Sequence, residues 1–228
     1  MLYTKEAVRD NIRNRDGKRV FYLGKGDQLT SDARDFLNRE RIAILPAQQA
    51  RPERYRLLSG AYMENKPEHW THLNGDVLVP KTHPRIRFRG MIDSLEAELL
   101  LCMTEADDQT RAQLAAVLAL ARTLVRCDVL DEPVPEEPLC GMTQQELRDR
   151  SHRPQDYYGQ PHFMPGAEDG RLLLQINRAR CAARAAELAA AEAFTDRDGM
   201  LTREDLLRAM NRLSSMLYLM MIRLKAGK

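Results

Sequence analysis

The sequence predicts a mainly α-helical protein, in which an up-down bundle of about five helices follows a small α/β module. Two alanine-rich runs, 114–125 and 182–193, strongly favour helices that pack at close distance. Apolar residues also recur at helical spacing from Ile86 to Met103. The runs typical of strands lie before residue 47, so helix dominates the rest of the chain.

Changes in composition along the chain predict three regions. Residues 1–46 alternate between helix and strand patterns and form the α/β module. Residues 47–83 are rich in Arg, Pro, Glu, Asn and Tyr without sustained periodicity, and we expect a linker or active-site loop ordered by packing on the bundle. Residues 84–228 carry the helical patterns and form the bundle domain.

Composition narrows the possible partners and location. The 228 residues carry 35 Lys and Arg against 33 Asp and Glu, so overall charge does not favour a nucleic-acid or membrane partner. The apolar run 217–224 is too short to span a bilayer. Four cysteines lie far apart without a CxxC pair, and no signal peptide precedes them. We therefore expect a cytoplasmic protein with reduced thiols.

In the module we expect helices at 4–14 and 31–41 and strands at 19–23 and 42–45. The turn 24–26 reads Gly-Lys-Gly, which ends a strand or cradles a phosphate. It lacks the spacing of a P-loop and a Ser or Thr after the Lys, so the simpler turn is favoured.

Two further patterns raise the possibility of a metal. His69 and His72 stand three residues apart, but no Cys or carboxylate nearby completes a ligand set, which favours polar loop histidines. The segment around Gly199 has carboxylates at two positions of a calcium loop, but Phe194 occupies the first ligand position. We predict no protein-held metal site, and a Gly turn followed by a helix cap at Thr202.

The remaining helices follow from periodicity and caps. A helix at 110–127 is ended by the proline-rich run 131–138, and a capping box at Thr143 opens a short helix to about residue 150. Long helices then cover 171–194 and 202–225. Between the short helix and the first of these long helices, residues 151–166 form an aromatic and Pro/Gly-rich loop, a composition typical of functional loops.

Two groups of polar residues are candidates for a site. Arg180, Arg184 and Glu187 share one helix face at i, i+4 and i+7, which suits a polyphosphate, although these residues alone favour solvated charges on an Ala-rich helix. Asn211 and its neighbours lie in an apolar helix, where unpaired polar groups are costly. The polar groups around Asn211 therefore need a partner, either protein or ligand.

Three ordered motifs together resemble the ATP:corrinoid adenosyltransferases of the PduO and EutT type. The run 211–215, Asn-Arg-Leu-Ser-Ser, is similar to the family's Asn-Arg-Leu-Ser helix start. The Arg180-x3-Arg184-x2-Glu187 pattern is similar to Arg-x3-Arg-Arg-x-Glu, with Ala in place of the second adjacent Arg. Lys81-x2-Pro-Arg followed by Gly-Met-Ile-Asp93 resembles the start of the family's first bundle helix.

The ethanolamine-utilisation branch of this family is the more similar one. Residues 71–73, 130–133, 150–154 and 210–221 resemble that branch, as do residues 29–34 in the module. Two departures stand out. The Gly-rich Thr-Gly-Asp-x-Gly loop of the propanediol branch is absent, so other groups, such as Thr71 to Asp76, would help to hold phosphates. The His and Cys-Cys-x-x-Cys metal motif of some ethanolamine-branch members is missing between Tyr55 and Thr71, which argues against a metal-dependent form.

The resemblance implies an enzyme that moves the 5′-deoxyadenosyl group of ATP onto cob(I)alamin, giving adenosylcobalamin and triphosphate, in ethanolamine utilisation. It implies cobalamin, ATP and Mg²⁺ as ligands, a homotrimer or dimer with sites between subunits, and association with a bacterial microcompartment. Catalytic roles carry over to Asp93, Arg180 and Arg184. Roles in binding ATP or corrinoid carry over to Thr71, Lys81, Glu187, Asn211, Arg212, Ser214, His162 and Phe163.

Within this set the resemblance implies specific contacts. Lys81, Arg180 and Arg184 would hold the triphosphate, Glu187 and Asn211 would orient ATP, and Asp93 would pair with an Arg across a subunit interface. Arg212 would contact the nucleotide or tie two helices together.

The loop 162–166 is similar to the family's aromatic-x-x-Pro-Gly loop, which blocks the lower face of cobalt. His162 takes the blocking position with Phe163 beside it, and an imidazole there could exclude a cobalt ligand or coordinate the cobalt. Two alternatives to an enzyme remain: a non-catalytic corrinoid carrier or sensor with this fold, suggested by the missing Gly-rich loop, and a purely structural helical oligomer.

Overall fold

The computed structural model describes residues 1–15, 17–47 and 55–227. Its contacts divide the chain into two compact units, Met1–Tyr55 with Tyr62–Asn65, and Arg56–Ala61 with Lys66–Lys228. Part of the predicted linker, residues 48–54, lies outside the described residues. The three region boundaries given above stay a prediction.

The first unit is a small α/β module, as its helix and strand patterns predict. β2 pairs antiparallel with β3, and β3 pairs parallel with β5. The unit buries Val8, Phe21, Ala33, Leu37 and Ile42. Its elements are β1 (Leu2–Tyr3), α1 (Lys5–Asp10), β2 (Arg13–Arg15), β3 (Lys18–Leu23), β4 (Gln28–Leu29), α2 (Ser31–Arg39) and β5 (Ala43–Pro46).

Short strands occupy part of the segment expected to be a linker. They are β6 (Tyr55–Leu57), β7 (Tyr62–Met63), β8 (Trp70–Asn74) and β9 (Val77–Pro80). β8 and β9 form an antiparallel hairpin, and Gly75 in its turn has a positive φ of 49°. Leu73, Val77 and Val79 are buried there. The strands are too short to produce a sustained alternation, which is why the sequence pattern missed them.

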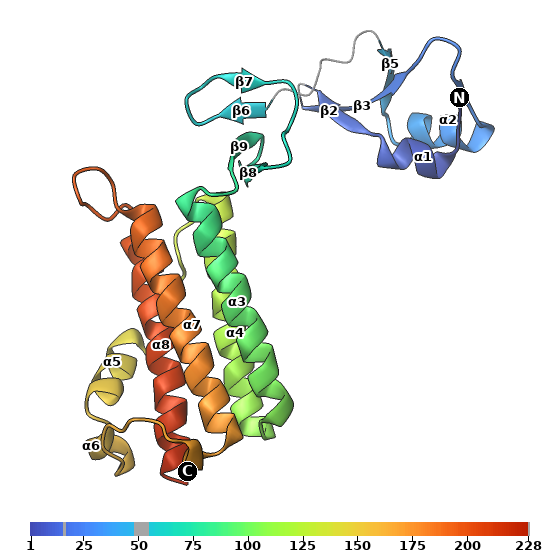
Figure 1. Cartoon of the computed structure of the whole chain (residues 1–228). Coiled ribbons are helices and arrows are strands. Elements are labelled where there is room, and N and C mark those ends of the chain that lie inside the picture. Colours follow the sequence, from blue (N-terminus) through green and yellow to red (C-terminus); the bar gives the residue numbers. More distant parts are fainter. Residues whose placement is uncertain (16, 48–54, 228) are drawn as a thin grey trace. The chain divides into compact units, whose positions relative to one another are not determined.

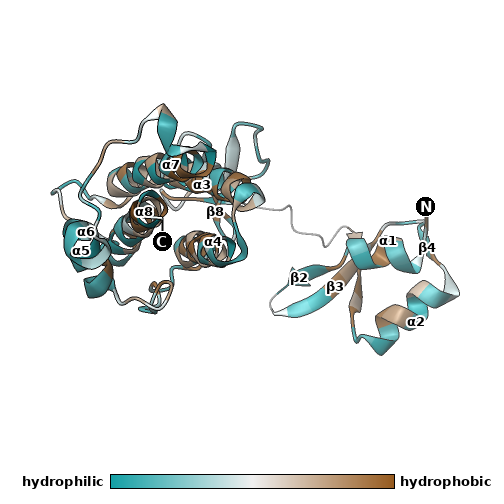
Figure 2. Cartoon of the chain, turned by 90° about the horizontal axis from the view of Figure 1, so that it is seen from below, coloured by the Kyte–Doolittle hydropathy of each residue, from teal (hydrophilic) through white to brown (hydrophobic). Residues whose placement is uncertain are grey.

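Four long helices form the bundle, which confirms the predicted fold class. α3 (Pro84–Glu105) runs antiparallel to α4 (Asp108–Leu130), and α7 (Arg171–Phe194) runs antiparallel to α8 (Glu204–Lys225) (Figure 1). Two shorter helices, α5 (Gln144–His152) and α6 (Pro154–Tyr158), lie against α8 on the outside of the bundle (Figure 2).

Two local expectations differ from the structure. The segment 151–166 is not entirely loop, because α5 continues to His152 and α6 follows at Pro154. The last helix begins at Glu204, and Thr202 is not its cap: the Thr202 hydroxyl donates to the Phe194 carbonyl at 2.8 Å. This bond closes the turn between α7 and α8 before the helix starts.

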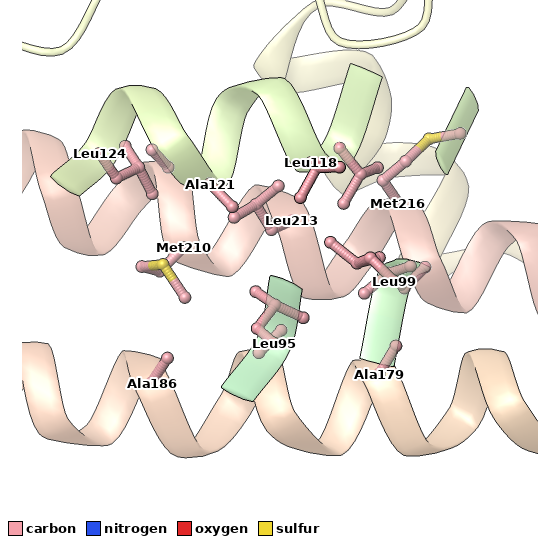
Figure 3. Packing of buried hydrophobic residues seen from close by; sticks show 14 of the residues in the cluster. Leu95, Leu99, Leu118, Ala121, Leu124, Ala179, Ala186, Met210, Leu213 and Met216 are labelled. Atoms are coloured by element: carbon pink, nitrogen blue, oxygen red, sulfur yellow. The ribbon is translucent and has the colours of Figure 1, made fainter. Parts of the chain in front are cut away.

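The bundle core combines small residues on α7 with larger ones on the other long helices. α7 turns Ala179, Ala183 and Ala186 inward, so that the backbones of α3 and α8 can approach it closely. Figure 3 shows Leu95 and Leu99 from α3 and Leu213 from α8 within this core. Among the described residues, no helix is long and apolar enough to cross a membrane.

Candidate functional site

A cavity of about 360 Å³ opens between α7, α8, the end of α5 and the segment after α6. It gathers six residues that the sequence singled out, three from α7, two from α8 and His162. The residues that line it are Ser151, His152, His162, Arg180, Arg184, Glu187, Asn211, Ser214, Ser215 and Tyr218.

The two α7 arginines bring positive charge to the cavity, and neither forms an ion pair with a described carboxylate. Nε and Nη2 of Arg180 donate to the Oδ1 atom of Asn177 at 3.1 and 2.9 Å, which orients the guanidinium without cancelling its charge. Arg184 is exposed and makes no hydrogen bond or ion pair with any residue that the structure describes. Both side chains can therefore direct forked donors toward a polyanion.

A hydrogen-bonded chain connects the two helices at the cavity wall. The Asn211 side-chain amide on α8 donates to Glu187 Oε1 on α7 at 3.1 Å, and its own Oδ1 accepts a bond from Arg212. Because the amide has one donating and one accepting end, both bonds together set its orientation. Glu187 is therefore one of the partners that the polar side chains around Asn211 require.

His162 is held by both of its ring nitrogens. Nε2 lies 3.2 Å from the carbonyl oxygen of His152, which can only accept, so Nε2 carries the proton. Burial raises the pKa of Tyr218, and its protonated hydroxyl donates to Nδ1 across 2.7 Å. The two rings also stack with centroids 5.7 Å apart. In a neutral imidazole, these two contacts select the Nε2–H tautomer.

Phe163 and Arg212 belong to the same region but do not line this cavity. Phe163 packs against the bundle core, with the Lys225 ammonium 5.7 Å from its ring centre. The Arg212 guanidinium points to α5, where Nη1 donates to the Gln144 carbonyl at 3.2 Å. Of the two residues predicted at the lower face of cobalt, only His162 reaches the cavity.

Three predicted residues lie elsewhere in the second unit. Thr71 sits in β8 opposite Val79, and Lys81 follows β9 with its Nζ 3.5 Å from a carboxylate oxygen of Glu68. Asp93 is exposed on α3 and has no ion pair among the described residues. The single chain therefore does not bring these three residues to the cavity.

Several lining residues stand in motifs that the sequence singled out but received no predicted role, notably Tyr218, His152 and Ser215. Tyr218 follows Asn211 by seven residues and Ser214 by four, so helical spacing alone places all three on one face of α8. That spacing is the signal that could have found it. His152 could not be found in this way, since it reaches the cavity only because α5 folds back on α8.

Asp128 is another residue that the sequence did not single out. Its buried carboxylate accepts from Arg85 Nε at 2.7 Å and from Arg89 Nε at 2.6 Å, joining the end of α4 to the start of α3. His83 caps α3, and burial, followed by the charges of both arginines, lowers its pKa. This cluster holds the beginning of α3, just after Lys81.

The turn 24–26 and the two histidines, which the sequence did not favour as phosphate or metal sites, make other contacts in the structure. The Gly24 amide donates to the Asp27 carboxylate at 3.2 Å, so an acidic group fills the turn that could have cradled a phosphate. His69 accepts from the Trp70 indole while His72 contacts the Gly75 carbonyl, and the two rings do not converge. Nowhere in the described ranges do three His, Cys, Asp or Glu side chains form a possible metal site.

Comparison with known proteins assigns this region to a family. Residues 61–224 match the family described as cobalamin adenosyltransferase. The corrinoid adenosyltransferase EutT of Salmonella typhimurium is 35% identical over 157 residues, and that of Escherichia coli K12 is 34% identical. Each match covers 69% of this chain and 59% of the relative, so it spans about three fifths of the relative's length.

Solved structures agree on the fold. Two variants of a PduO-type ATP:corrinoid adenosyltransferase from Lactobacillus reuteri, each complexed with cobalamin and ATP, superpose with TM-scores of 0.52 and 0.51. They are 18% and 17% identical and cover 68% of this chain, and 84% and 87% of their own chains. Together with the match over residues 61–224, the helical bundle and its cavity show that this chain belongs to the cobalamin adenosyltransferase family.

Proposed function

We propose that this protein is an ATP:cob(I)alamin adenosyltransferase, which transfers the 5′-deoxyadenosyl group of ATP to cobalt. The observation that carries the proposal is the meeting of Arg180, Arg184, Glu187 and Asn211 with His162 at one cavity. The two arginines, Glu187 and Asn211 suit a nucleoside triphosphate. His162 suits the face of a corrinoid ring. ATP and cobalamin are both bound in the two PduO-type structures that share this fold.

The reaction needs no protein nucleophile. The Co(I) centre, generated by an external one-electron reductant, attacks the 5′ carbon of ATP, a cobalt–carbon bond forms, and the carbon–oxygen bond to triphosphate breaks. Cobalt passes formally from +1 to +3, and the triphosphate leaves with the bonding electrons. Because a polyanion departs, the protein's work is positioning and charge stabilisation. Arg180 and Arg184 supply the positive charge, and neither is ion-paired among the described residues.

The hydrogen-bonded side chains of Asn211 and Glu187 orient the nucleotide in this proposal. Their hydrogen bond holds both side chains at the wall beside the arginines. The Ser215 hydroxyl adds a neutral donor along the same helix, while the Ser214 hydroxyl donates to the Asn211 carbonyl at 3.0 Å and keeps its lone pairs as acceptors. Such fixed polar groups lose little freedom when the substrate binds.

For the corrinoid we assign His162 the role of excluding a lower ligand from cobalt. Its Nε2 proton is donated to the His152 carbonyl, and its Nδ1 lone pair accepts from Tyr218. Coordination of cobalt would require one of these bonds to break. In this proposal the imidazole ring therefore covers the lower face of cobalt without coordinating it.

Mg²⁺ fits as an ion carried by the triphosphate. Glu187 and the serine hydroxyls offer oxygen atoms, while a complete set of protein ligands is absent from the described residues. Mg²⁺ characteristically keeps water and substrate phosphates as most of its ligands. When bound, it would neutralise charge on the leaving triphosphate.

We further propose a homo-oligomer, a trimer or a dimer, in which Thr71, Lys81 and Asp93 reach the cavity of a neighbouring subunit. Support comes from the fact that none of the three lines the cavity of its own chain, and from the exposure of Lys81 and Asp93. A role in ethanolamine utilisation, in the cytoplasm and beside or within a bacterial microcompartment, belongs to the same proposal and rests on the EutT relatives.

The test is an anaerobic assay of the full chain with ATP, Mg²⁺, cob(II)alamin and a strong reductant, following adenosylcobalamin by its absorbance. We expect turnover in the wild type and a loss of at least about a hundredfold in Arg184→Ala. Arg197→Ala is the matched control, because Arg197 is also exposed but lies in the turn after α7. Corrinoid binding without ATP binding or turnover would instead favour a carrier or sensor.

A further inference from the structure

A second, larger cavity of about 540 Å³ lies at the opposite end of α5 from the candidate site. Three arginines enter it: Arg148 from α5, and Arg208 and Arg212 from α8. Glu136 and Glu137 are the carboxylates in its lining. No role assigned so far uses this cavity, whose only residue with a role implied by the family resemblance is Arg212.

The arginine charges are only partly neutralised. Arg208 lies 3.6 Å from Glu136 and 3.8 Å from Glu204. The Arg212 guanidinium donates only to neutral oxygens, those of Gln144 and Asn211, and its buried Nε has no partner among the described residues. Arg148 is exposed, and its guanidinium forms no hydrogen bond or ion pair within the described ranges. Two of the three guanidiniums, those of Arg148 and Arg212, therefore line the cavity without an ion pair to any described carboxylate.

The start of α5 adds to this positive field. Gln144 and Gln145, its first two residues, line the cavity, and first-turn amides have no acceptor within a helix. The capping box at Thr143 uses the amide of Glu146 and leaves those two amides to outside acceptors. Helix N-termini favour tetrahedral anions, and arginine forks match the same oxygens.

The geometry also separates this cavity from the candidate site. The two cavities lie at the two ends of α5, whose nine residues span roughly 12 Å. Arg212 and Asn211 stand between them, joined by a hydrogen bond. An anion held by Arg148 at the start of α5 is therefore not the group that Arg180 and Arg184 would hold.

We propose that the cavity between the start of α5 and α8 is a second anion site that takes a phosphoryl group, with Arg148, Arg208 and Arg212 as its donors. The phosphoryl group has two chemical sources. One is a free polyphosphate or nucleotide, and the other is the phosphodiester in the nucleotide tail of a corrinoid, which rests on the proposed function.

Isothermal titration with pyrophosphate tests the site independently of catalysis. The Arg184→Ala variant serves as background, because it weakens the candidate site. We expect one pyrophosphate per chain to remain bound in this background. Adding Arg148→Ala should weaken that binding at least about tenfold, and adding Arg197→Ala should change it less than about twofold. The thermal unfolding transition of each variant checks that the protein remains folded after the arginine is replaced.

Two results would overturn the proposal: no pyrophosphate binding in the Arg184→Ala background, or equal binding with and without Arg148. Arg148→Lys should fall between wild type and alanine, since it keeps charge but loses the fork. Failure of the adenosyltransferase assay would leave these titrations interpretable, so the two proposals fail separately.

Cobalamin and cobinamide, which lacks the nucleotide tail, distinguish the two sources. If Arg148→Ala weakens binding of cobalamin but not of cobinamide, the site takes the tail phosphodiester. If it weakens pyrophosphate and affects neither corrinoid, the site takes a free polyphosphate. Either result supports the site, and Arg197→Ala again provides the comparison.

Discussion

Asn211 on α8 donates a hydrogen bond to Glu187 on α7 across 3.1 Å, and this bond joins two motifs that lie 24 residues apart in the chain. It turns an isolated polar patch in an apolar helix into one wall of a cavity. Since Arg212 donates to the other end of the Asn211 amide, the same residue also links the candidate site to the second cavity.

Asn211→Ala tests this link. Loss of the amide leaves Glu187 without its donor, so we expect adenosyl transfer to fall at least about tenfold in kcat/KM. The free energy of unfolding should fall by only about 1 kcal/mol, the worth of one hydrogen bond. Steady-state kinetics and urea unfolding measure the two effects. Asn38→Ala, at an exposed position of α2, should change neither.

Tyr218→Phe tests the role assigned to His162, which is to exclude a lower ligand from cobalt. Without the phenol, the Nδ1 lone pair of His162 loses its donor and becomes available to a metal. We expect slower adenosylation, with electron paramagnetic resonance of bound cob(II)inamide showing nitrogen splitting in the variant only. Cobinamide brings no base of its own, so any such splitting comes from the protein. Nitrogen splitting in the wild type would contradict the assignment.

Asp128→Ala should be strongly destabilising. It removes the carboxylate that both Arg85 and Arg89 contact, and Asp128 itself is fully buried. Two partly buried guanidiniums would lose their counter-charge, at a cost of about 3–5 kcal/mol in the free energy of unfolding. The exposed pair between Arg87 and Glu192 joins α3 to α7 in the same bundle. Glu192→Ala should therefore cost less than about 1 kcal/mol in the same urea titration.

Asp205 should make stability depend on acid pH. Its hydrogen bond from Arg203, aided by the Val134 amide, lowers its pKa from 3.8 to about 2 in the folded protein. A depressed pKa stabilises the fold above the unfolded value, and this contribution is lost as pH falls from about 4 toward 2.

Because the Asp205 side chain is 32% exposed, we expect Asp205→Asn to cost only about 1 kcal/mol at pH 7. The difference from wild type should shrink below pH 4. Urea unfolding at pH 7, 5 and 3 checks this course. Asp198→Asn, at an exposed turn position, should show no such pH dependence. An equal difference at pH 7 and pH 3 would contradict the assignment.

Much of this architecture follows from sequence pattern alone. The helical periodicity of α3, the alanines of α7 and the capping box of α5 each determine a local structure, because 3.6-residue spacing and cap chemistry act within a few residues. The same spacing places Arg180, Arg184 and Glu187 on one face of α7. The motifs at 81–93, 180–187 and 211–215 were also sufficient to indicate the family.

Only the tertiary structure decided which of these faces meet. That α5 folds back on α8, that His162 stacks on Tyr218 and that Arg212 turns away toward Gln144 depend on contacts between residues far apart in the chain. Local propensity does not encode such contacts, since they arise from burying apolar faces and pairing buried polar groups together. The sequence by itself therefore determined the helices and the residue types of the site, and packing decided its walls.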